Sequence, residues 1–125
     1  MQNNKNQEQI NNNNTQDALN KYLKPKRVTV FAMSYCPYSS RAIQLLNNLN
    51  IKPEVINIDQ IPDLKNDKNF RSALDRDSNI STFPKIYIGI KCYGGYTDLY
   101  DLFTENRLFE ILKKANIDFI EEDYY

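Results

Sequence analysis

The stretch VTVFAMSYCPYSSRA, residues 28–42, runs from a strand-like segment into a helix and carries one cysteine between them. The segment 27–33 is apolar and rich in β-branched residues, which indicates a buried strand. Pro37 suits the first position of a helix, and apolar residues continue at helical spacing to about residue 50. The pattern therefore predicts a strand, a turn and a helix, with Cys36 at the N-cap.

Outward from this stretch, helical and strand-like patterns alternate along the chain. We expect strands over 53–59 and 84–90, with Ile86, Ile88 and Ile90 alternating in the latter, and a short strand over 91–93. We expect helices near 15–23 with Thr15 as N-cap, over 63–77, from about 98, and from Thr104 as N-cap. The alternation predicts an α/β fold whose central sheet is covered on both faces. The link between the last two strands is too short for a crossover, so the four-stranded sheet should be mixed.

Composition excludes several classes of function. The chain has 125 residues, 16 basic and 16 acidic side chains, and no histidine. A net charge of zero argues against binding to nucleic acid or to an anionic membrane. The absence of histidine removes the usual base of cysteine and serine hydrolases and, with two cysteines, argues against a zinc site. On these grounds we expect no metal in the protein.

The ends and the cysteines suggest the organisation and location of the chain. Residues 1–14 are rich in asparagine and glutamine and lack the apolar or arginine-rich pattern of a targeting segment, so we expect a disordered tail. Residues 15–125 then form one domain. Two cysteines 56 residues apart do not make a disulfide framework, and no run of 18 apolar residues exists. We expect a cytoplasmic protein.

Cys36 has the setting of a reactive thiol. At a helix N-terminus, the N–H groups of Tyr38 and Ser39 and the helix dipole favour the thiolate, so the pKa should fall below about 8.5. The hydroxyl of Ser39, one turn along, can donate a hydrogen bond to the sulfur. The alternatives are a cysteine packed as a small apolar residue and an ordinary serine at a helix start.

Three segments carry a resemblance to a known family. VTVFAMSYCPYSSRA resembles the active-site segment of glutaredoxins, with Ser39 in place of the second cysteine of C-P-Y-C. TFPKIYIG, residues 82–89, resembles their T-V-P segment, which contains a cis-proline, and CYGGYTDL, residues 92–99, resembles their G-G-x-[ST]-D-L segment. Their order and spacing over residues 15–116 imply the thioredoxin-like fold of that family.

The resemblance implies a binding site for glutathione. Its residues would be Tyr38, Arg71, Thr82, Phe83, Pro84, Thr97 and Asp98. Pro84, if cis, turns the backbone of Phe83 outward to pair with the tripeptide. The N–H groups of Thr97 and Asp98 would receive the γ-glutamyl carboxylate, and Arg71 the glycine carboxylate. The alternatives are a trans proline that starts an edge strand, an aspartate that only caps its helix, and a solvated arginine.

One position departs from the family pattern, and the second cysteine has a simpler interpretation. Met33 stands where the family usually has a lysine, and Arg27 lies too far away to replace it, because six residues of strand span about 20 Å. We expect weaker glutathione binding and a less depressed pKa at Cys36 than is usual in the family. Cys92 is interpreted as a packed strand residue.

The function implied is a glutathione-dependent thiol–disulfide oxidoreductase that acts by a monothiol mechanism. Cys36 and Ser39 would form the catalytic pair, with glutathione as co-substrate and glutathionylated proteins as partners of a monomer. The alternative is a dimer that binds a [2Fe–2S] cluster through Cys36 and glutathione. Pro37 and the C-P-Y-S tetrad argue mildly against that alternative. A weaker third possibility is a binding module without redox activity.

Overall fold

The computed structural model describes residues 16–120, in which four strands form one mixed sheet in the order β2-β1-β3-β4. The strands are β1 (Val28–Ala32), β2 (Glu54–Asn57), β3 (Lys85–Ile88) and β4 (Lys91–Cys92). β1 pairs parallel with β2 and antiparallel with β3, and β3 pairs antiparallel with β4. The predicted mixed sheet with its terminal hairpin is confirmed. The predicted tail 1–14 and the predicted cap Thr15 lie outside the described residues.

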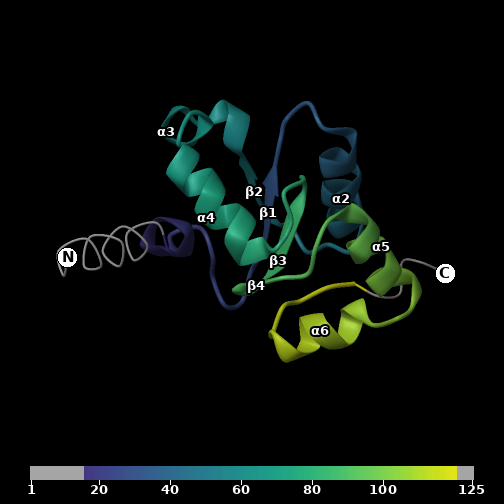
Figure 1. The fold of residues 1–125 in the computed structure, drawn as a ribbon. Helices are drawn as coiled ribbons and strands as arrows, with labels where there is room; N and C mark the ends of the chain where they lie inside the picture. The colour runs from purple at the N-terminus through teal and green to yellow at the C-terminus, as the bar shows by residue number, and fades with distance from the viewer. Residues whose placement is uncertain (1–15, 121–125) are drawn as a thin grey trace.

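Helices cover both faces of this sheet (Figure 1). One face carries α2 (Pro37–Asn48), α5 (Tyr96–Thr104) and α6 (Leu108–Lys114). The other carries a short helix over 16–20 and α4 (Lys68–Ser78), which follows η1 (Ile58–Gln60) and α3 (Pro62–Lys65). None of the helices in the described part of the chain is long and apolar enough to cross a membrane.

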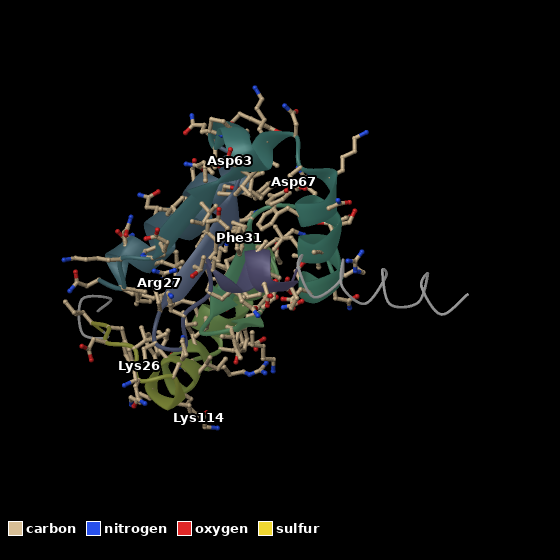
Figure 2. The ribbon with its side chains drawn as sticks, turned by 90° about the vertical axis from the view of Figure 1, so that its left-hand side faces the viewer. Lys26, Arg27, Phe31, Asp63, Asp67 and Lys114 are labelled. Carbon is tan, nitrogen blue, oxygen red and sulfur yellow. The ribbon has the colours of Figure 1, made fainter. Side chains whose placement is uncertain are left out.

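The sheet separates two apolar cores. Val28 and Val30 of β1 point toward α2, α5 and α6, whereas Phe31 packs with Phe70 of α4. Alternate side chains of a strand point to opposite faces, so a sheet covered on both sides buries all of them. In Figure 2, Phe31 lies in the interior, with Asp63 and Asp67 at one end of the molecule and Lys26 and Lys114 at the other.

Two predicted element boundaries before and after β3 are wrong. The single helix expected over 63–77 is two helices, because Asp67 starts α4 as its N-cap and its carboxylate accepts the N–H of Phe70 at 3.0 Å. β3 ends at Ile88, and Ile90 is 67% exposed in the hairpin turn rather than facing the core. Gly89 makes that turn with φ of +66°, and a Cβ there would lie 2.9 Å from the carbonyl oxygen of Pro25.

The C-terminal helices also begin and end differently from the prediction. Thr104 is not an N-cap: it is the last residue of α5, and α6 follows Arg107 as N-cap. The turn between them passes through Asn106, whose φ is +60°. Asparagine tolerates this left-handed conformation better than most residues. After α6 the chain still packs on the domain, because the Ile120 N–H donates to the Leu49 carbonyl at 2.8 Å.

Candidate functional site

Cys36 lies at the junction between β1 and α2, in the predicted N-cap position. Its backbone is extended, with φ of −90° and ψ of 117°, and Pro37 follows as the first helical residue. The Cys36 N–H donates to the Met33 carbonyl at 3.0 Å, which closes the turn out of β1. The thiol is free and partly buried. The local sequence therefore sets the sulfur at the N-terminus of a twelve-residue helix.

The groups around the sulfur favour its ionised form. Burial on its own would raise the pKa of the Cys36 thiol. The N–H and hydroxyl of Ser39 and the N–H of Tyr38 outweigh that effect, so the pKa lies below its ordinary value. Ser39 is only 2% exposed, and its hydroxyl oxygen accepts the Met33 N–H at 3.4 Å. The hydroxyl is thus fixed on one side by the backbone and directed at the sulfur on the other.

The loop that leads to Cys36 is anchored by Asp59, which our sequence reading missed. The Ser34 N–H donates to one carboxylate oxygen of Asp59 at 2.8 Å, and the Ser34 hydroxyl donates to the other. These hydrogen bonds lower the pKa of Asp59. The sequence did contain a signal for this contact. Asp59 follows β2, and the carboxyl ends of the parallel strands β1 and β2 meet at one edge of the sheet, so residues that follow the two strands can lie close together.

The segment before β3 brings a second backbone region to the cysteine. The Phe83–Pro84 peptide bond is cis, as the resemblance implies. The Cys36 thiol lies within sulfur hydrogen-bonding distance of the Phe83 carbonyl oxygen, at 3.7 Å. Two segments 47 residues apart in sequence therefore meet at the sulfur.

A pocket of about 330 Å³ opens beside this contact. It is lined by Tyr38, Ile80, Thr82, Phe83, Pro84, Gly95, Tyr96, Thr97 and Asp98. Six of the seven predicted glutathione-binding residues are among them, and Arg71 is the exception. Sequence reading missed Ile80, Gly95 and Tyr96. The last two stand inside the CYGGYTDL motif, and the Tyr96 ring lies 6.2 Å from that of Tyr38.

The far side of the pocket is the N-terminus of α5. Gly95 is the N-cap, and its N–H donates to the Asp98 carboxylate at 2.9 Å. Gly94 has φ of +103°, and a Cβ there would collide with that carboxylate. The first N–H groups of a helix have no acceptor within it, so those of Thr97 and Asp98 are suited to receive an anion. Asp98 caps the helix and also lines the pocket.

Arg71 does not line the pocket but lies against the ring of Phe83, which does. Its guanidinium carbon lies 4.7 Å from the centre of the Phe83 ring. The side chain also lines a separate groove at the start of α4, of about 480 Å³, together with Lys65 and Lys68. Arg71 therefore borders the predicted glutathione site at the ring of Phe83.

The two other sequence positions of interest are occupied by packed side chains. Met33 is 8% exposed and belongs to the core on the α4 side of the sheet. Cys92 is a free thiol in β4, and burial raises its pKa. Residues 16–120 contain no group of three or more histidine, cysteine or carboxylate side chains arranged to hold a metal ion.

A mixed sheet with helices on both faces, a cysteine at the N-terminus of the helix after β1 and a cis-proline before β3 define a thioredoxin-like thiol protein. Comparison with known proteins identifies the family within this class. The Glutaredoxin family model matches residues 28–92. Human glutaredoxin-1 is 30% identical over 99 residues, which are 79% of this chain and 93% of that protein. The chain belongs to the glutaredoxin family, whose members are generally thiol oxidoreductases.

Two further comparisons add detail. Rice monothiol glutaredoxin-S10 is 29% identical over 103 residues, and the match covers 82% of this chain but 62% of the rice protein. The crystal structure of a buckwheat glutaredoxin–glutathione complex has a TM-score of 0.75 at 22% identity, covering 87% of this chain and 96% of that chain. At that identity the likeness shows the fold.

Proposed function

We propose that the protein reduces mixed disulfides between glutathione and protein thiols, using Cys36 as its one catalytic thiol. The observation that carries the proposal is the position of the Cys36 sulfur. It has a lowered pKa and lies 3.7 Å from the Phe83 carbonyl oxygen, at the edge of a pocket that ends at the N-terminus of α5. A lowered pKa raises the fraction of nucleophilic thiolate at neutral pH and makes the sulfur a better leaving group.

The pocket offers complementary groups to each part of glutathione. The γ-glutamyl carboxylate would bind at the N–H groups of Thr97 and Asp98, and the Asp98 carboxylate would meet the amino group. The backbone of Phe83 would pair with the central cysteine of the tripeptide like an added strand. Arg71 would bind the glycine carboxylate. The buckwheat neighbour of the same fold is a complex with glutathione, which supports glutathione as the ligand.

The reaction then takes two exchange steps. The Cys36 thiolate attacks the glutathionyl sulfur of the mixed disulfide, a new S–S bond forms, and the protein thiolate leaves and takes a proton from water. The thiolate of a second glutathione attacks the glutathionyl sulfur on Cys36, which releases glutathione disulfide and regenerates the Cys36 thiolate. Ser39 has no thiol with which to form an internal disulfide, so the resolving thiol comes from solution.

Turnover of a defined substrate tests the proposal. The full chain, as a monomer, should reduce a glutathionylated cysteine peptide with glutathione, followed by chromatography of the released peptide thiol. Purification should yield a colourless protein. A brown dimer with poor turnover would contradict the proposal and favour the alternative, in which Cys36 and glutathione bind a [2Fe–2S] cluster. The proposal includes a cytoplasmic location, which rests on composition alone.

A further inference from the structure

Two cations lie against the ring of Phe83. The guanidinium carbon of Arg71 is 4.7 Å from the ring centre, and the ammonium nitrogen of Lys85 is 5.0 Å from it. Both distances are within the range of cation–π attraction. The family segment that TFPKIYIG resembles has valine at this position, and valine has no aromatic face. The arrangement is therefore a feature of this chain rather than of the family pattern.

Of these two cations, Lys85 is held firmly by its own partners. The side chain is fully buried, and its ammonium group forms an ion pair with Asp75 at 2.9 Å. It also donates to the Ser78 hydroxyl at 3.1 Å and to the Ile80 carbonyl. Burial lowers the pKa of Lys85, and the Asp75 carboxylate counteracts this effect. With its ammonium group bound to Asp75 and Ser78 of α4 and to Ile80 in the loop after it, Lys85 provides a fixed support for the Phe83 ring.

Among residues 16–120, the Phe83 ring is the one group that holds the Arg71 guanidinium. The Nε atom of Arg71 is buried without a hydrogen-bond partner, and no hydrogen bond or ion pair to its guanidinium occurs within residues 16–120. A guanidinium carries five N–H groups in one plane. When it stacks on an aromatic face, those N–H groups stay available for a carboxylate. The cation is thus held in place but still free to bind an anion at the border of the pocket.

We propose that Phe83 is a positioning residue that holds Arg71 ready for the glycine carboxylate, and so makes the protein selective for glutathionyl groups with a free carboxylate at that end. This inference rests on the proposed function. The ring acts through Arg71, whereas the backbone of Phe83 acts on the tripeptide directly. Replacing the ring should therefore weaken the binding of one carboxylate and leave the chemistry at Cys36 in place.

A comparison of two substrates tests the inference. A cysteine peptide is joined by a disulfide either to glutathione or to glutathione esterified at the glycine carboxylate, and release of the peptide thiol is followed by chromatography. Phe83→Leu should raise KM for the glutathione disulfide by roughly three- to tenfold, with a smaller effect on kcat, because it removes the cation–π support. With the ester, which has no carboxylate to bind, the same substitution should raise KM by a clearly smaller factor.

Three further variants complete the experiment. Phe83→Tyr keeps the aromatic face and should restore KM close to that of the unaltered protein. Arg71→Met should reproduce the selective loss, and the double variant with Phe83→Leu should show no additional loss, because both changes remove one interaction. If Phe83→Leu folds poorly, Phe83→Met replaces it, both as the single variant and in the double variant with Arg71→Met.

The outcomes separate this inference from the proposed function. An equal rise in KM for both substrates would show that the ring is only a wall of the pocket and would overturn the inference. Additive losses from Phe83→Leu and Arg71→Met would overturn it as well. If the unaltered protein does not turn over the glutathione disulfide at all, the proposed function itself fails.

Discussion

The two cysteines of this chain are both free and partly buried, yet their pKa values shift in opposite directions. At Cys36, burial is outweighed by the N–H and hydroxyl of Ser39 and the N–H of Tyr38. At Cys92, burial dominates although the Gly94 N–H donates to the sulfur at 3.3 Å. One backbone donor is not enough to offset the loss of water, whereas several donors at the start of a helix are.

The comparison shows that the place of a thiol in the fold decides its reactivity. Cys36 follows a buried strand and precedes a helix, so several peptide dipoles point at it. Cys92 lies in a short strand, where alternating peptide dipoles largely cancel. The carboxylates of Asp77 and Asp98 add a repulsion that raises the pKa of Cys92 further. Cys92 is also surrounded by more protein atoms than Cys36, and this deeper burial raises its pKa in the same direction.

The largest expected difference in activity is the one between a variant that lacks the Cys36 sulfur and a variant that lacks the Cys92 sulfur. Cys36→Ser should abolish turnover of a glutathionylated peptide, because the step that forms the mixed disulfide with the enzyme is lost. Cys92→Ser should leave kcat and KM within about twofold, since its thiol stays protonated at neutral pH. The measurement is the release of peptide thiol at saturating glutathione. Activity that survives Cys36→Ser but is lost in Cys92→Ser would reverse the assignment.

The pH dependence of alkylation should separate the two thiols without mutation. The rate of reaction with iodoacetamide follows the thiolate fraction, so the Cys36 rate should level off at a lower pH than that of an unstructured cysteine peptide. The Cys92 rate should keep rising above that point. Each pKa unit changes the thiolate fraction about tenfold, so at pH 7 Cys36 should react faster than Cys92, by a factor that reports the difference between their pKa values. Mass spectrometry of the two peptides measures both rates in one sample.

Ser39→Ala sharpens the same measurement. Loss of the hydroxyl bond to the sulfur should raise the pKa of Cys36 and move its alkylation profile to higher pH, because that bond favours the thiolate. Ser40→Ala, at the exposed neighbouring position, is the matched control and should leave the alkylation profile unchanged. An unchanged profile in Ser39→Ala would mean that the backbone N–H groups alone hold the thiolate.

The local parts of this site could be predicted from sequence, and the long-range parts could not. The N-cap position of Cys36 follows from a strand pattern and Pro37 alone. Gly95 and Tyr96 were within a recognised motif and could have been named. The stacking of Arg71 on Phe83 joins α4 to the segment before β3, and no spacing along the chain encodes that meeting.

The wrong helix boundaries have a different cause, because they concern competing local signals. Asp67 is of a residue type that favours an N-cap, but it stands inside a stretch whose apolar residues fit one helix. In the structure the N-cap forms at Asp67, and the stretch is divided into two helices. Thr104 also fits an N-cap, but α5 continues through it, and its hydroxyl donates to the Asp101 carbonyl at 3.2 Å. The turn at Asn106 was the stronger signal. Asn50 and Asn79 follow α2 and α4 with the same positive φ.

The smallest expected effect concerns Met33, three residues before Cys36 and 8% exposed. Met33→Lys would keep a long aliphatic stem in the core while its ammonium group extends toward water and the thiolate. It should lower the apparent KM for glutathione by about two- to fivefold, as expected of a partly exposed ion pair worth up to about 1 kcal/mol. It should also move the alkylation profile of Cys36 to lower pH, which widens the difference between the pKa values of Cys36 and Cys92.

Met33→Gln is the control, because glutamine is uncharged and of similar length. An unchanged or higher KM in Met33→Lys would show that a cation at this position does not reach the tripeptide.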